Sequence, residues 1–287
     1  MLMTSLQDIA KHFPQLRSIE EIKIGGQKCV YSAVHAEYGD IALKIVLNHE
    51  NDDRILREIK IIKNNSFPNV PAIYKCGDVN FDGKTYIYIY EQKISGTDLR
   101  EIIQSGDKFP FIEVIQLLDN LLETVVKLEK QSIVHRDIKP DNILRDEDGK
   151  FWLIDFGIAR DLKDVSLTAT GANFGPHTAG YAAPEQFRNL KRQIDSRADL
   201  FSIGLVAYEL LHGVNPFVSG AHSFIDILLK TETLTEYPLS IPEDTGGELS
   251  GFIQTLMQKG HTWRPPSAMI AYSWFNEIVD KLGLEVN

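Results

Sequence analysis

The segments "IVHRDIKPDNIL" (133–144) and "LIDFGIAR" (153–160) carry the most informative pattern in this sequence of 287 residues. They place three short, oxygen-bearing side chains, those of Asp137, Asn142 and Asp155, close to turn-forming residues. Divalent cations such as Mg²⁺ prefer oxygen ligands of this kind and complete their coordination with substrate phosphates. Either segment alone is also typical of a capped turn or a hairpin. The two in succession predict a site for a cation and a phosphate.

The composition is that of an ordinary globular protein, with 43% hydrophobic and 24% charged residues. A net charge of −10 argues against a general nucleic-acid or anionic-membrane binder, which needs a positive surface. Cys29 and Cys76 are too few for a disulfide framework and lack the spacing of metal ligands. The most apolar long stretch, 201–214, contains Glu209 and is shorter than the roughly 18–20 residues of a membrane span. With no signal-peptide pattern at the N-terminus, we expect a cytoplasmic protein.

The periodicity of the sequence changes near Thr97. Before this residue, five segments alternate in hydrophobicity as strands do, and one segment, 51–65, has the apolar spacing of a helix. After it, the spacing is helical. The expected strands are 21–27, 28–35, 40–47, 72–76 and 85–92, and the expected helices of the second part are 111–131, 196–213, 221–230, 248–258 and 267–283. A small strand-rich lobe followed by a larger helical lobe makes the space between them the expected ligand site.

In this order the motifs resemble those of the eukaryotic-type (Hanks-type) protein kinases over about residues 20–277. The resemblance implies an α+β, bilobal protein-kinase-like fold. A small β-rich N-lobe with one main helix would cover about 20–95, and a larger, mostly helical C-lobe about 96–277. Residues 1–19 would be an N-terminal extension and 278–287 a C-terminal tail. The implied activity is ATP-dependent phosphorylation of serine or threonine, with Mg²⁺, or alternatively Mn²⁺, as the metal.

The resemblance assigns roles to the segment "HRDIKPDN" (135–142), which matches the family's catalytic loop. Asp137 would orient the substrate hydroxyl and accept its proton. Lys139, typical of the serine/threonine-specific form, would stabilise the transferring phosphoryl group. Asn142 would hold a metal ion together with Asp155 of the "DFG" motif.

Three further residues match positions that support this loop. The segment "GYAAPE" (180–185) resembles the end of the family's activation segment. Asp199 matches an aspartate that braces the catalytic loop, and Arg264 matches an arginine that pairs with Glu185. Without the resemblance, Arg264 is equally typical of an exposed surface residue.

The segment "IALKIV" (41–46) matches the strand that carries the family's phosphate-contacting lysine, here Lys44. Alternation puts Ala42 on the same face of the strand, where the resemblance places adenine. Glu58 lies on the apolar side of its predicted helix, where a carboxylate is costly unless it is paired. The resemblance implies that its partner is Lys44.

The segment "IGGQKCVYSAV" (24–34) matches the nucleotide-binding loop, with Lys28 at the family's third glycine position. Lys28 either adds a positive charge near the β- and γ-phosphates or points to solvent. The resemblance places adenine between Val30 and Leu144, with its backbone partner at one of the residues 91–93. The full set implied to bind ATP is Ile24, Gly25, Gly26, Gln27, Lys28, Val30, Ala42, Lys44, Glu91, Gln92, Lys93, Leu144 and Asp155.

The expected activation segment holds four hydroxyl residues, Ser166, Thr168, Thr170 and Thr178. In the family, the arginine before the catalytic aspartate, here Arg136, pairs with a phosphate on this segment. We expect autophosphorylation at Thr168 or Thr170, with Ser166 next, and a structural role for Thr178.

Two other functional classes share parts of this pattern, pseudokinases and small-molecule kinases. A pseudokinase usually lacks the lysine, the aspartates or the metal ligands, all of which are present. A small-molecule kinase generally lacks an "APE"-type segment. We therefore expect a stand-alone kinase of bacterial type that acts on protein substrates and has no nucleic-acid or membrane partner. Its activity would be regulated by its own activation segment, through trans-autophosphorylation in a transient homodimer, or by a regulatory partner.

Overall fold

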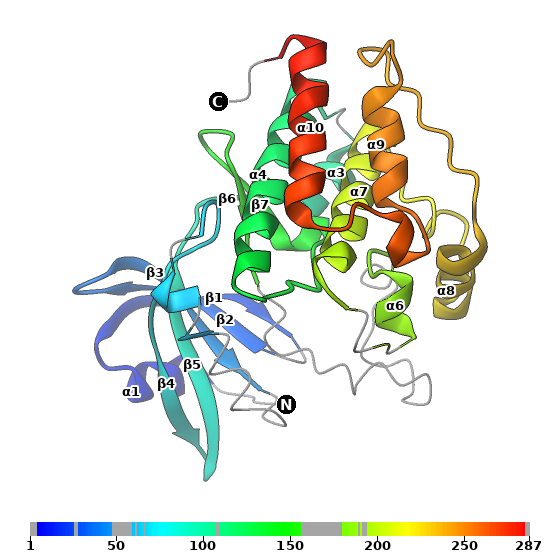
Figure 1. Cartoon of the computed structure of the whole chain (residues 1–287). Helices are drawn as coiled ribbons and strands as arrows, with labels where there is room; N and C mark the ends of the chain where they lie inside the picture. Colours follow the sequence, from blue (N-terminus) through cyan, green and yellow to red (C-terminus); the bar gives the residue numbers. More distant parts are fainter. Residues whose placement is uncertain are drawn as a thin grey trace. The chain divides into compact units, whose positions relative to one another are not determined.

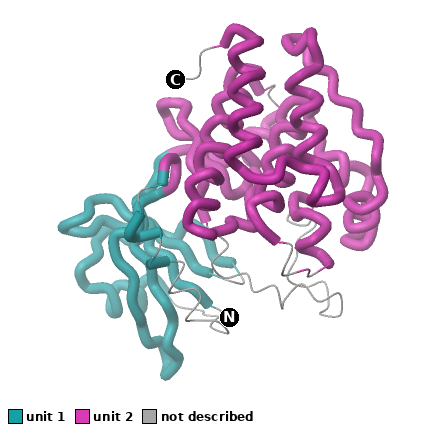
Figure 2. The backbone as a smooth tube through the Cα atoms, in the orientation of Figure 1, with its two compact units in different colours: residues 1–67, 71–95, 158–161 teal, residues 68–70, 96–157, 162–287 magenta. Residues whose placement is uncertain are grey.

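The structure is a computed structural model that describes residues 5–25, 28–47, 59–60, 62–65, 67–106, 109–155, 180–188, 190 and 194–284. These residues form two compact units, coloured separately in Figure 2. The first unit comprises the described residues within 5–67 and 71–95, and the second those within 68–70, 96–155 and 180–284. Each unit has a hydrophobic core of its own. Among the described residues, no helix is both long enough and apolar enough to span a bilayer.

The first unit is built on a five-stranded antiparallel sheet with the strand order β1-β2-β3-β5-β4 (Figure 1). Its strands are β1 (Leu16–Ile24), β2 (Lys28–His35), β3 (Gly39–Val46), β4 (Ile73–Phe81) and β5 (Lys84–Gln92). All five strands predicted from alternation are present, and β4 continues beyond its predicted end at Cys76. A turn at Asp82 and Gly83, with φ values of 50° and 79°, then reverses the chain into β5.

One face of this sheet carries the core of the first unit. The buried Tyr90 packs there with Ile9 of α1 (Leu6–His12) and with Phe13, which directly follows that helix. A capping box between Ser5 and Asp8 starts α1. Residues that the sequence assigns to an N-terminal extension therefore contribute to the core of the sheet, and β1 already begins at Leu16.

The opposite face of the sheet carries the charged side chains of Lys44 and Glu91. Residues directly opposite in neighbouring strands project to the same face of a sheet. Lys44 on β3 lies between Val30 on β2 and Ile89 on β5. Ala42 shares this face, as alternation predicts, and lies opposite Glu91. Lys44 and Glu91 are therefore diagonal neighbours on one surface.

The helix predicted at 51–65 is only partly described. Residues 59–60 and 62–64 are helical. Ile59 and Ile62 are buried, as their spacing predicts. Glu58 lies outside the described residues.

The second unit is mainly helical (Figure 1). Its α-helices are α3 (Leu99–Ser105), α4 (Phe111–Lys130), α6 (Pro184–Phe187), α7 (Ser196–His212), α8 (Phe224–Thr233), α9 (Glu248–Leu256) and α10 (Ala268–Leu282). α7 is buried along most of its length and packs against α4, α9 and α10. Gly204 allows the close approach of α9, because a Cβ atom here would lie 2.7 Å from Cβ of Leu256. The helix ends at Gly213, whose φ of 87° suits glycine.

A small antiparallel sheet completes the second unit and positions its polar loop. It contains β6 (Gly96–Asp98), β7 (Ile143–Asp146) and β8 (Phe151–Leu153), in that order. The 3-10 turn η1 (Pro140–Asn142) leads directly into β7, and a second such turn, η4 (His261–Trp263), precedes α10. The strands have only three or four residues, which is too few for alternation to predict them.

Candidate active site

One buried carboxylate, that of Asp199 on α7, holds the backbone that precedes Asp137. Asp199 is 0% exposed and accepts hydrogen bonds from the backbone N–H groups of His135 and Arg136, each at 2.8 Å. Arg136 has a φ of 68°, a left-handed conformation that costs a non-glycine residue about 1–2 kcal/mol. Burial raises the pKa of Asp199 to about 6, while the two N–H groups act to lower it. The two hydrogen bonds to this carboxylate stabilise the strained backbone.

The side chain of Asp137 is fixed by two neighbours in the same loop. Nζ of Lys139 lies 3.1 Å from Oδ2 of Asp137. Nδ2 of Asn142 donates to the same oxygen at 2.9 Å and to the Asp137 carbonyl at 2.8 Å. The Asp137 side chain is 16% exposed, so it is still accessible to a ligand. A carboxylate held in this way can accept a proton from a hydroxyl within hydrogen-bond reach.

Asn142 and Asp155 are brought together by the backbone. The N–H of Ile154 donates to the carbonyl of Asn142 at 2.9 Å, so Asp155 follows directly beside it. The amide nitrogen of Asn142 is bound to Asp137, which leaves its Oδ1 as the atom for a cation. Asp155 has a φ of 60°, a conformation of the kind that clusters at functional sites.

These two oxygen donors fit Mg²⁺. This ion is usually held by one or two protein ligands plus substrate phosphates and water, not by a closed cage of side chains. No three Asp, Glu, His or Cys side chains of the described residues are grouped around a metal position. The carboxylate of Asp155 and the amide oxygen of Asn142 would therefore hold the ion from one side.

Lys44 on β3 forms an ion pair with Glu91 near the end of β5. The two side chains are 9% and 8% exposed, respectively. The sequence predicts an ion pair between Lys44 and Glu58, but Glu58 lies outside the described residues. For Glu91, the sequence predicts only a place among the residues that bind ATP. The contact between Lys44 and Glu91 was not predicted. It arises because Glu91 lies opposite Ala42, two residues from Lys44 on the same face.

The β1–β2 turn and the end of β5 are partly described. The N–H of Gly25 donates to the carbonyl of Lys28 at 2.9 Å, which closes the turn. The two residues between them, Gly26 and Gln27, lie outside the described residues. At the end of β5, the N–H of Gln92 donates to the carbonyl of residue 72 at 2.8 Å. The backbone donor of this expected adenine-contacting residue is therefore already engaged within the first unit, whereas Lys93 follows the strand.

The apolar residues expected around adenine are distributed over three strands. Ile24 ends β1 and is half-buried, and Val30 is buried on β2 opposite Lys44. Leu144 is half-buried on β7, opposite Trp152.

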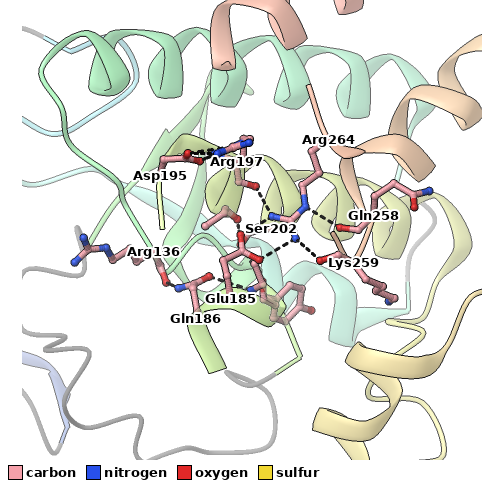
Figure 3. A network of polar contacts seen from close by, with 12 residues as sticks. Arg136, Glu185, Gln186, Asp195, Arg197, Ser202, Gln258, Lys259 and Arg264 are labelled. Carbon is pink, nitrogen blue, oxygen red and sulfur yellow. Dashed lines mark hydrogen bonds and ion pairs between the residues drawn. The ribbon is translucent and has the colours of Figure 1, made fainter. Parts of the chain in front are cut away.

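Figure 3 shows a polar network that joins α6 to the segment after α9. Glu185 and Arg264 form a two-pronged ion pair, with 2.6 Å between Oε1 and Nη1 and 3.0 Å between Oε2 and Nη2. Their side chains are 3% and 0% exposed. Arg264 also donates to the carbonyls of Gln258 at 2.7 Å and Arg197 at 2.8 Å. Because the remaining donors are satisfied, this buried pair fixes α6 within the second unit. It is the contact that the resemblance implies.

Comparison with known proteins agrees with this geometry. Residues 16–275 match the family described as the protein kinase domain. The chain belongs to this family. It is 34% identical over 208 residues to the probable serine/threonine-protein kinase PknB of Lactococcus lactis, covering 70% of this chain and 32% of that protein. It is also 32% identical over 200 residues to the serine/threonine-protein kinase PknL of Mycobacterium bovis, covering 69% and 49%.

A third relative is matched over more of the chain. The protein is 29% identical over 270 residues to a probable serine/threonine-protein kinase of Clostridium acetobutylicum, covering 92% of this chain and 38% of that protein. The chain therefore spans between 32% and 49% of the length of these three relatives. Membership of the protein kinase domain family confirms the α+β fold class predicted from the sequence. The expected activation-segment residues Ser166, Thr168, Thr170 and Thr178 lie outside the described residues.

Gln186 links α6 to the loop of residues 135–142 (Figure 3) and was not predicted from the sequence. Its Nε2 donates to the carbonyl of Arg136 at 3.0 Å, and its Oε1 accepts the N–H of Ala183 at 3.0 Å. The strained backbone at Arg136 is therefore held from two sides, by Asp199 and by Gln186. The only signal in the sequence was its position directly after Glu185.

Arg100 on α3 forms a second cluster that the sequence did not predict. Its Nη2 donates to the hydroxyl of Tyr181 at 2.6 Å, and its Nη1 lies 3.2 Å from Oε1 of Glu209. Its Nε lies 3.4 Å from Oδ2 of Asp141 in the loop of residues 135–142. The Tyr181 hydroxyl also donates to Glu209, and burial raises the pKa of Tyr181 well above its usual value, with the Glu209 charge adding to the effect. The cluster joins four segments that are distant in the sequence.

The ion pair between Glu185 and Arg264 makes a prediction about stability. Arg264→Met leaves a buried carboxylate uncompensated and should cost about 3–5 kcal/mol of unfolding free energy. The exposed pair of Arg188 and Glu232 (59% and 24% exposed) provides the control, because Arg188→Met should cost at most about 1 kcal/mol. Urea unfolding followed by tryptophan fluorescence measures both, since all three tryptophans lie in the second unit. Equal losses for the two variants would contradict the structural importance of the buried pair.

Lys259 borders the same network in an apolar setting. Its ammonium lies 3.8 Å from the ring centroid of Phe217 and 5.1 Å from that of Tyr237. Within the described part of the chain it has no hydrogen-bond acceptor. Burial lowers the pKa of Lys259 to about 7. The charge of Arg264 adds to this shift, and that of Glu232 opposes it.

The pKa of Lys259 predicts how stability varies with pH. The unfolded chain keeps this proton up to about pH 10.5 and the folded chain only up to about pH 7. Between these values the unfolded state binds more protons, so the folded state gains stability as pH rises from 7 to 10. Urea unfolding at pH 7 and pH 9 should show a larger gain for the wild type than for Lys259→Met. An identical pH dependence in the two proteins would mean that Lys259 remains charged in the folded state.

Proposed function

We propose that the chain is an ATP-dependent serine/threonine protein kinase, which transfers the γ-phosphoryl group of Mg-ATP to a hydroxyl group of a protein substrate. The observation that carries this proposal is the fixed carboxylate of Asp137, held by Lys139 and Asn142 at the end of a backbone that Asp199 braces. The names of the relatives support serine and threonine as acceptors. Since this chain spans only 32% to 49% of the length of those relatives, activity and substrates are proposed here for this chain itself.

Each residue has a separate task in the proposed reaction. Asp137 orients the acceptor hydroxyl and takes its proton as the new bond from oxygen to phosphorus forms and the bond to the leaving ADP oxygen breaks. Lys139 places a positive charge beside the transferring group. Asn142 and Asp155 hold the divalent cation, which neutralises phosphate charge when bound. Mg²⁺ is the proposed metal, and Mn²⁺ accepts the same oxygen ligands.

On the first unit, Lys44 is the proposed contact for the phosphates of ATP. It lies on the face that carries Ala42, one strand away from the β1–β2 turn. A lysine at this position supplies a point charge to a phosphate oxygen. Lys28 is the first residue of β2 and lies opposite Val46. It is therefore at the same end of the sheet as the β1–β2 turn.

Removal of charge at single positions tests the proposed roles. Asp137→Asn and Asp155→Asn should each abolish transfer of labelled phosphate from ATP to a mixture of candidate protein substrates. Asp155→Asn should also weaken the binding of Mg-ATP, measured by calorimetry, whereas Asp137→Asn should leave it nearly unchanged. Asp148→Asn, at an exposed turn position, is the matched control and should retain activity. Turnover near the wild-type level in either active-site variant would remove the kinase assignment.

We further propose that the chain phosphorylates its own activation segment, at Thr168 or Thr170 and then at Ser166, in a transient homodimer. We propose that the guanidinium of Arg136 then forms an ion pair with this phosphate. The backbone of Arg136 is held in place by Asp199 and Gln186. Mass spectrometry of wild-type protein incubated with Mg-ATP should find phosphate at these residues and none in Asp137→Asn. The rate of autophosphorylation per molecule should rise with protein concentration, because one molecule modifies another. A fully active protein with an unmodified segment would exclude this switch.

A further inference from the structure

The ion pair between Lys44 and Glu91 imposes a constraint on the first unit that the proposed chemistry does not require. Both side chains are more than nine-tenths buried. A buried ammonium or carboxylate is stable only when an opposite charge or several hydrogen bonds compensate it. Glu91 therefore stabilises the charged form of Lys44 inside the sheet, and Lys44 does the same for Glu91.

The register of the strands shows in which direction Glu91 draws the ammonium. Lys44 lies opposite Val30 on β2, and the β1–β2 turn approaches the sheet where Lys28 lies opposite Val46. Glu91 lies at the other side of Lys44, level with Ala42. Two residues along a strand correspond to about 7 Å. An ammonium bound to Glu91 is therefore directed away from the end of the sheet that carries the turn.

We propose that Glu91 is a competing carboxylate that holds Lys44 away from the phosphates of the nucleotide, so that Mg-ATP must break this pair in order to engage the lysine. Glu91 is then a positioning residue, which acts on ATP through Lys44. This inference rests on the proposed function, because it takes Lys44 as the contact for the phosphates. The affinity for any nucleotide that uses Lys44 is lowered by the free energy of the pair. The affinity for adenosine, which has no phosphate, is not.

The comparison of ATP with adenosine isolates this competition. Calorimetry should be done with Mg-ATP and with adenosine, on the full chain and on Glu91→Gln, which keeps the shape of the side chain but removes its charge. We expect the dissociation constant for Mg-ATP to fall about tenfold, which corresponds to about 1.4 kcal/mol, and that for adenosine to stay within about twofold. Asp78→Asn is the matched control, since it removes one exposed carboxylate from β4 of the same sheet, and it should change neither constant.

A second pair of variants tests whether the effect passes through Lys44. In the Lys44→Met background, Glu91→Gln should no longer change the affinity for Mg-ATP, because the charge for which the two groups compete is absent. Glu91→Asp, which retains the carboxylate, should keep the ratio of ATP to adenosine affinity close to that of the wild type. Thermal unfolding of each variant identifies any that fails to fold. If Glu91→Gln does not fold, Glu91→Met is used in its place, with the same expected gain in affinity for Mg-ATP.

Each adverse result has a distinct meaning. If the wild type binds Mg-ATP and Glu91→Gln binds it equally or more weakly, Glu91 does not compete and the inference is overturned while the proposed function stands. If adenosine and Mg-ATP gain equally, Glu91 acts by occupying space near adenine, and the competition is again rejected. If neither protein binds Mg-ATP, the proposed function fails together with the inference.

Discussion

The two hydrogen bonds from the backbone of His135 and Arg136 to Asp199 are the constraint on which the proposed active-site residues of the second unit depend. They stabilise a left-handed residue directly before Asp137, and that residue sets the direction in which the carboxylate leaves the loop. Asp199 can serve in this way because α7 is buried along most of its length. Water does not compete for its oxygens, and the low dielectric strengthens both bonds. A rigid central helix thus determines the geometry of an irregular loop.

Buried charges in the second unit lie on α7 or contact it, and they join segments that are distant in sequence. Glu209, near the end of α7, meets Arg100 and Tyr181, while Arg264 reaches both Glu185 and the carbonyl of Arg197 at the start of α7. Such groups are expensive to bury, so a complete buried pair adds little net stability. The loss of any one partner leaves the other charge unmatched.

The sequence predicted features with local causes and missed those that depend on tertiary alignment. The stop of α7 at Gly213 and the shared face of Ala42 and Lys44 follow from the properties of single residues and from alternation. The contact of Glu185 with Arg264, 79 residues apart, was predictable only through resemblance to a family. The pair between Lys44 and Glu91 was not predictable, because it depends on the register of β3 against β5. A shift of one residue would place Glu91 on the opposite face.

That pair also shows how one interaction can serve stability and oppose function. A lysine kept inside a sheet needs a compensating charge at all times, including when no nucleotide is bound. Glu91 supplies this charge from the strand next to that of Lys44. A phosphate group can use Lys44 only to the extent that it interacts with the ammonium more strongly than Glu91 does. If Lys44 is the phosphate contact as proposed, the balance between these two anions, both in a region of low dielectric, sets the nucleotide affinity.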